Sequence, residues 1–72
     1  MSKEYIISFI RDTIAEKGLK QKAVAEAARI GERQFSAIIH GRRKLAADEA
    51  LRLCAVLGCT PNELYGYDGS AA

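Results

Sequence analysis

Glu32, Arg33 and Gln34 are three consecutive side chains whose polar groups are suited to recognising flat hydrogen-bonding edges. A guanidinium donates two parallel hydrogen bonds, a primary amide donates and accepts, and a carboxylate accepts. The edges of guanine, adenine and cytosine in a DNA major groove present the matching groups. Arg33 would bond guanine or a phosphate, Gln34 adenine or a phosphate, and Glu32 would accept from cytosine or orient Arg33. Ala37, on the same outward face, could touch a thymine methyl group.

Positive charge gathers around these residues. Residues 20–44 carry seven basic and two acidic side chains, a net charge of +5, although the whole chain carries only +2. Residues 1–19 sum to zero and residues 45–72 to −3. This distribution is the electrostatic footprint expected for phosphate binding, although a solvated charged face would have the same composition. The basic and polar candidates for phosphate contacts are Lys20, Lys22, Ser36, His40, Arg42, Arg43 and Lys44.

Other chemistries lack a supporting set of residues. His40 is the only histidine, and no nucleophile or paired acid is placed beside it, so we expect no enzyme. It would contact phosphate, more strongly when protonated, or simply lie on the surface. Cys54 and Cys59 have no histidine partners at metal spacing, so we interpret both as small buried hydrophobic residues. We expect no metal, cofactor or small-molecule ligand.

Two short helices must hold these side chains, over residues 20–28 and 32–40, with a tight turn between them. Apolar residues recur in both at helical spacing, and the connection has the length of a helix-turn-helix turn. The apolar positions are Val24, Ala25, Ala28, Phe35, Ile38 and Ile39. The second helix would therefore pack its apolar face on a core while its polar face enters a major groove.

Three further helices are predicted, over residues 3–17, 46–57 and from Pro61 onward. Ser2 is the expected N-cap of the first, and Thr60 and Glu63 form a capping box for the last. Gly18, Gly41 and Gly58 are expected to end helices. The inner stripe of the fourth helix is predicted to contain Ala47, Ala50, Leu51, Cys54 and Leu57.

The length of 72 residues indicates one domain, over residues 1–66, followed by a flexible tail over residues 67–72. A chain this short buries only about 60% of its unfolded surface, so dimerisation would help its marginal core. Tyr67 would join a dimer contact or lie on the surface; we favour the surface. No run of eighteen apolar residues predicts a membrane span, and the N-terminus does not begin a secretion signal, so we expect a cytoplasmic protein.

From Ile10 to Tyr65 the sequence resembles, without a gap, the helix-turn-helix family of phage repressors and Cro-type (lambda-repressor-like, XRE-type) regulators. The matching features are Lys17-Gly18-Leu19, Gln21, Ala25, Phe35, Ile38, Gly41, Leu57-Gly58 and Thr60-Pro61-Asn62-Glu63-Leu64-Tyr65. The resemblance implies an all-α, compact five-helix domain with the helix-turn-helix at its second and third helices. It also implies that Gln21 bonds backbone phosphate and braces a side chain of the recognition helix; the alternative is a solvent-exposed glutamine.

The chain departs from the family pattern at three places. Arg29 replaces a common glycine at a position that tends toward positive φ, so either the turn differs or Arg29 accepts strain. Gly31 stands where a serine or threonine cap is common. Ile14 and Ile39 occupy positions where many members have an Arg–Glu ion pair, and we predict that the two isoleucines pack together.

These features favour a sequence-specific DNA-binding transcriptional regulator of the kind found in bacteria, phages or mobile elements. It would act as a repressor, as a homodimer on a palindromic site in double-stranded DNA, with helices four and five supplying the interface. Activation by contact with polymerase is equally compatible with the fold. The alternative is a protein-interaction module, such as an antitoxin or anti-regulator, that uses the same fold without specific DNA binding.

Overall fold

The computed structural model describes residues 3–66, which form helices and connecting turns without a strand. The helices are α1 (Lys3–Glu16), α2 (Gln21–Ala27), α3 (Glu32–Ile39), α4 (Ala47–Leu57) and α5 (Pro61–Tyr65). The predicted all-α class is confirmed, and the first four helices begin and end within one residue of their predicted bounds. Ser2, Tyr67 and the tail over residues 67–72 lie outside the described residues, so the predictions for them stay open.

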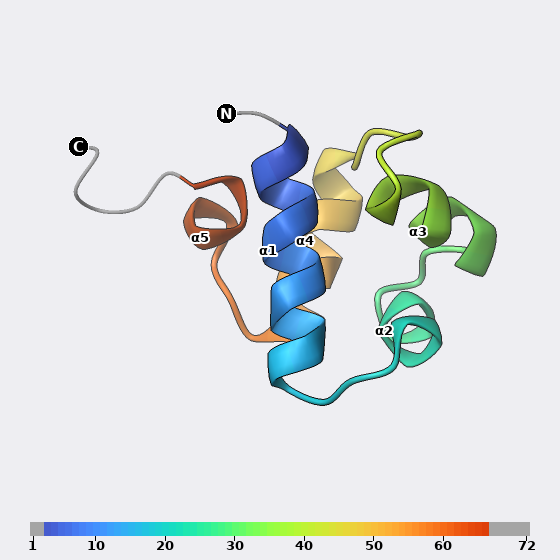
Figure 1. The fold of residues 1–72 in the computed structure, drawn as a ribbon, viewed down its shortest axis with the longest axis horizontal. Helices are drawn as coiled ribbons and strands as arrows, with labels where there is room; N and C mark the ends of the chain where they lie inside the picture. Colours follow the sequence, from blue (N-terminus) through green and yellow to red (C-terminus); the bar gives the residue numbers. More distant parts are fainter. Residues whose placement is uncertain (1–2, 67–72) are drawn as a thin grey trace.

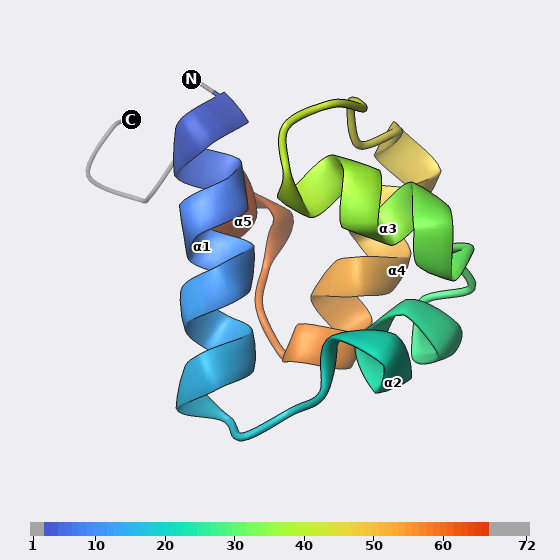
Figure 2. The ribbon, with the colours of Figure 1, turned by 45° about the vertical axis from the view of Figure 1, so that its right-hand side comes forward.

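The helices are arranged around one core, with α1 between α5 on one side and α2 and α3 on the other (Figure 1). α1 packs against α3 and α5, while α4 packs against α2 and α5. When the molecule is turned, α3 lies in front, α2 lies below it and α4 lies behind (Figure 2). Within residues 3–66, no helix has the length and apolar content that crossing a membrane requires.

Large apolar side chains from every helix meet in this core. The most deeply buried are Phe35, Ile10, Leu53, Leu57, Leu64 and Val24. No polar or charged residue between positions 3 and 66 is buried, so the centre of the fold is made of apolar side chains.

The predicted stripe of α4 was partly wrong. Ala50, Cys54 and Leu57 are buried as predicted, whereas Ala47 and Leu51 are exposed and Leu53 takes a core position. The error has a geometric cause, because Ala47 and Leu51 form a row at i, i+4 that lies beside the buried row. Both rows are apolar, so spacing alone does not distinguish the inner row from the outer one.

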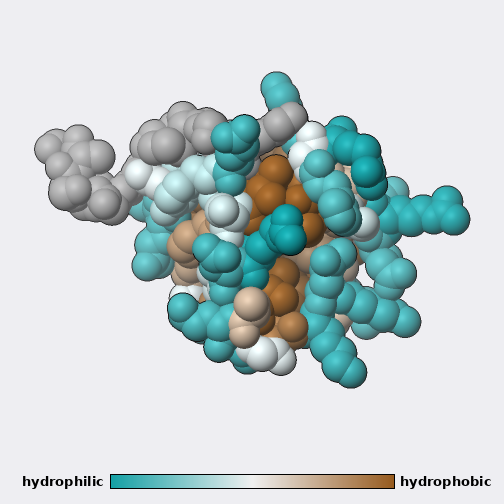
Figure 3. Space-filling model, viewed as in Figure 1, coloured by the Kyte–Doolittle hydropathy of each residue, from teal (hydrophilic) through white to brown (hydrophobic). Residues whose placement is uncertain are grey.

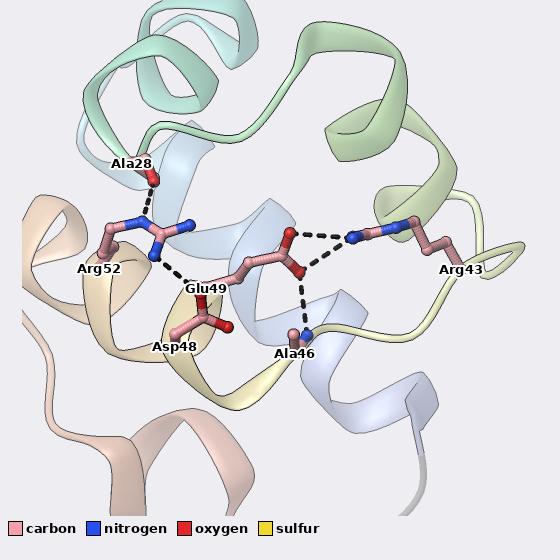
Figure 4. Close-up of polar contacts among 6 residues, drawn as sticks. All are labelled: Ala28, Arg43, Ala46, Asp48, Glu49 and Arg52. Carbon is pink, nitrogen blue, oxygen red and sulfur yellow. Dashed lines mark hydrogen bonds and ion pairs between the residues drawn. The ribbon is translucent and has the colours of Figure 1, made fainter.

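Arg29 accepts the strain that its position requires. Its φ is +57°, and the Ile30 N–H donates to the Ala25 carbonyl at 2.9 Å across the end of α2. This is the bond of a helix end that needs one left-handed residue, a conformation that costs a non-glycine residue roughly 1 kcal/mol. The Arg52 Nε donates to the Ala28 carbonyl at 2.7 Å, which satisfies another carbonyl at the same end (Figure 4).

The end of α4 and the start of α5 follow the sequence closely. Thr60 Oγ1 accepts from the Glu63 N–H at 3.1 Å and Glu63 Oε1 accepts from the Thr60 N–H at 2.8 Å, so the predicted capping box is confirmed. Cys54 is buried and Cys59 is half-buried, and both are free thiols. Burial raises the pKa of Cys59 to about 12, so its thiol stays protonated at neutral pH. The prediction that both cysteines are buried is therefore confirmed for Cys54 and only partly right for Cys59.

Candidate nucleic-acid interface

The apolar pattern of α3 fixes which of its side chains face outward. Phe35, Ile38 and Ile39 are buried, and the helix therefore turns Glu32, Arg33 and Gln34 into solvent at its N-terminal end. Ser36 and Ala37, which follow on the same helix, are half-buried. The first turn of α3 is thus the part of the helix whose side chains are most accessible to a ligand.

The start of α2 approaches the first turns of α3. Two residues of α2 and three of α3 line one shallow groove with a volume of about 400 Å³. The lining residues are Gln21, Lys22, Glu32, Arg33 and Ser36. The sequence predicts contacts with bases or phosphates for all five, and the fold brings them together although the two groups lie ten or more positions apart in the chain. Lys20, also exposed, precedes α2 at the same edge.

Gln34 lies differently from its neighbours. A Cβ atom built on Gly31 would collide with the Gln34 Oε1, so the glutamine side chain turns back over the start of its own helix. Gly31 provides no side-chain cap, and its lack of a side chain is what makes this conformation possible. In this conformation Gln34 does not point straight away from the helix, and contact with a base would require a change of rotamer.

His40, at the end of α3, also folds back on its helix. Its Nδ1 lies 2.8 Å from the Ser36 carbonyl oxygen, which can only accept, so Nδ1 carries the proton in this contact. The Ser36 hydroxyl lies 3.4 Å from the same nitrogen. The backbone after His40 turns at Gly41, with φ of +76°, and this residue ends α3 as predicted.

The basic loop that follows divides into free and paired cations. Arg42 and Lys44 are exposed, and within residues 3–66 no side chain forms a hydrogen bond or ion pair with either. Arg43 instead donates from both terminal nitrogens to Glu49, each bond 2.9 Å long (Figure 4). Glu49 Oε1 also accepts from the Ala46 N–H at 3.0 Å, so one carboxylate anchors the loop and caps the start of α4.

The electrostatics of this pair follow from its geometry. The hydrogen bonds from Arg43 hold the pKa of Glu49 below its ordinary value, and the bond to Glu49 raises the pKa of Arg43. The Glu49 side chain is only 12% exposed, so water screens the pair little on that side. Glu49 lies in the first turn of α4, and an acidic residue three positions into a helix is a capping signal, but no pattern in the sequence indicates its pairing with Arg43.

Salt dependence should separate the two kinds of cation. Log affinity falls as log salt rises, and Arg42→Ala and Lys44→Ala are each expected to make this slope less steep by about 0.9, the contribution of one phosphate contact. Arg43→Ala should change the slope by less than half of that, because Glu49 already neutralises its charge. Anisotropy titrations of a labelled duplex at several salt concentrations measure the slopes. Equal losses for the three variants would show that Arg43 leaves Glu49 for the DNA.

α2, the turn at Arg29 and α3 together define a helix-turn-helix of the DNA-binding class. The chain belongs to the family of Cro/C1-type HTH DNA-binding domains, whose family model matches residues 10–70. This match confirms the resemblance that the sequence indicated. No curated protein and no solved structure matches the chain significantly.

Proposed function

We propose that this DNA-binding domain is a sequence-specific transcriptional regulator, a repressor that binds a palindromic operator as a dimer. The observation that carries the proposal is the groove between the start of α2 and α3, where Gln21, Lys22, Arg33 and Ser36 converge. Two of its five lining residues are basic and one, Glu32, is acidic, and the groove opens beside the most exposed turn of a helix whose other face is fixed in the core. Membership of the Cro/C1-type family supports DNA as the partner.

The proposed mechanism assigns different tasks to the two helices. The first turn of α3 enters the major groove, where Arg33 donates two hydrogen bonds to guanine and Glu32 orients it or accepts from cytosine. Lys20, Gln21 and Lys22, at the start of α2, contact phosphates and fix how α3 enters the groove. Arg42 and Lys44 contact phosphates on the other side of α3, and Ser36 and His40 add further polar contacts.

A dimer would place one α3 in each of two successive major grooves, about 34 Å apart. A protein bound in this way covers the DNA and blocks polymerase by steric exclusion. The palindrome follows from the symmetry of the dimer, because each subunit contacts an identical half-site.

Selection from a random duplex library at physiological salt tests this proposal. We expect recovery of a palindromic sequence with half-site centres about one helical turn apart. Binding without sequence preference that disappears with modest added salt would leave only an electrostatic attraction to DNA and would contradict sequence specificity. No binding at all would favour the protein-interaction module on the same fold.

A further inference from the structure

α4 exposes an apolar ridge on the side that does not enter the core. Leu51 is 61% exposed, more than any other large hydrophobic residue in the described part of the chain. Ala47 and Ala55 lie one helical turn before and after it, and both are exposed. An exposed leucine between two alanines gives α4 an outer surface on which another helix could pack closely.

The ridge has the same profile in both directions. Leu51 lies four positions from each alanine, so the order small, large, small is unchanged when α4 is reversed. A two-fold axis beside Leu51 would therefore pack Leu51 on its equivalent and place Ala47 of one copy against Ala55 of the other. The interface of a two-fold dimer must be complementary to itself in this way, because both subunits contribute the same patch.

The charges beside the ridge obey the same symmetry. Asp48 and Arg52, three residues before and one after Leu51, lie on one flank of the ridge and form an ion pair of 3.1 Å (Figure 4). In an antiparallel pairing about Leu51, Arg52 of one copy would lie near Asp48 of the other. Opposite charges would then meet across the contact, which favours this orientation over a parallel one.

The surface around the ridge can extend the contact. A shallow groove lined by Ala27, Arg29, Arg52, Ala55 and Val56 adjoins it. An interface of standard size covers roughly 800 Å² on each partner, about one sixth of the 4793 Å² accessible surface of this chain. The ridge can supply the centre of such an interface and the adjoining groove part of its rim.

We propose that the ridge formed by Ala47, Leu51 and Ala55 is the surface on which a second copy of this chain docks, with the two α4 helices antiparallel. This inference rests on the dimer in the proposed function and assigns the residues that form it. α5, which was expected to share the interface, would lie outside the centre of this contact.

Sedimentation equilibrium of the wild type and of Leu51→Glu tests the proposal. The wild type should dimerise as concentration rises, and the variant should weaken dimerisation at least tenfold without losing its fold, since Leu51 is exposed in the monomer. Leu19→Glu is the matched control, because Leu19 is an exposed leucine far from the ridge in sequence, and it should dimerise like the wild type. A monomeric wild type, or equal dimerisation by Leu51→Glu, would overturn the proposal.

Cysteine cross-linking tests the antiparallel geometry directly. Leu51→Cys should form a disulfide-linked dimer under mild oxidation, and a mixture of Ala47→Cys and Ala55→Cys should cross-link to each other more than either does alone. The wild type, whose Cys54 is buried and Cys59 half-buried, is the control for background oxidation. Preferential cross-linking within each single variant would contradict the antiparallel pairing.

Measurements of DNA binding distinguish a failure of the proposed interface from a failure of the proposed DNA-binding function. Leu51→Glu should bind an isolated half-site as well as the wild type and lose the additional affinity of two half-sites. Half-site binding by a wild type that stays monomeric would overturn the interface and leave the DNA-binding role intact. Dimerisation through the ridge without any DNA binding would support the interface and contradict the DNA-binding role.

Discussion

Replacement of Ile39 by glutamate is expected to destabilise the fold by about 3–5 kcal/mol, which is a large share of the stability of a domain this small. Ile39 is 4% exposed and lies in the core beside α1. Residue 14 is isoleucine, half-buried and packed against the same core, so the new carboxylate would have no basic partner at that position. Arg11 and His40 line the groove at Ile39, but both are exposed, and a carboxylate in the core would have to leave it to reach them. It would also add negative charge near the C-terminal end of α3, where the helix dipole disfavours it.

Thermal unfolding followed by circular dichroism measures this effect. We expect Ile39→Glu to lower Tm by roughly 12 °C or more, since each kcal/mol corresponds to about 4–8 °C in a domain of this size. Ile39→Val is the matched control and should cost only about 0.5–1.5 kcal/mol. An unchanged Tm for Ile39→Glu would show that the side chain escapes to solvent.

The double variant Ile14→Arg/Ile39→Glu tests whether the two positions form a pair. α1 packs against α3, but direct contact between these two isoleucines stays a prediction. If they are neighbours, the added arginine should recover part of the loss, and the double-variant cycle should give a favourable coupling. Simple additivity would contradict the pairing.

The sequence alone predicted the helices well because several local signals agreed at each boundary. For α5, Thr60, Pro61 and Glu63 specify the start independently of the core, and the structure contains the bonds they imply. For α3, the apolar residues Phe35, Ile38 and Ile39 determine which face is buried, and this fixes the outward direction of Arg33. The groove between α2 and α3 follows from these local facts once the two helices are joined by a four-residue turn.

The remaining features depend on contacts that periodicity does not contain. Leu51 and Leu53 are equally apolar, and only the position of α4 against α2 and α5 decides that Leu53 is buried. Arg42 and Arg43 are adjacent arginines that the sequence does not distinguish, and only the fold of the loop brings Arg43 to Glu49. Figure 3 shows apolar side chains near the middle of the face viewed in Figure 1, between hydrophilic ones, and periodicity alone does not say which apolar residues stay accessible. Ile7 and Ile39 line a shallow groove between α1 and α3, together with Glu4, Ser8, Arg11, Asp12 and His40.

Replacement of Arg33 by alanine is expected to have the largest effect on DNA binding. Arg33 is exposed in the groove that α3 shares with the start of α2, and its guanidinium is the group best suited to guanine. Loss of a two-bond contact should cost about 1–3 kcal/mol in each half-site, or roughly 5- to 150-fold in affinity. Selection with this variant should recover sites in which one base of each half-site has become variable.

Arg33→Lys and Lys22→Ala distinguish base recognition from simple attraction to phosphate. Lysine keeps the charge but lacks the planar pair of donors, so Arg33→Lys should relax the same base while preserving most of the salt dependence. Lys22→Ala, on the opposite wall of the groove, should weaken binding uniformly across sequences and reduce the salt slope by about 0.9. If Arg33→Ala behaves like Lys22→Ala, Arg33 contacts phosphate. Base recognition must then come from Glu32, or from Gln34 after its side chain has changed rotamer and moved away from Gly31. If it relaxes one base alone, the first turn of α3 is the part of the molecule that selects the operator.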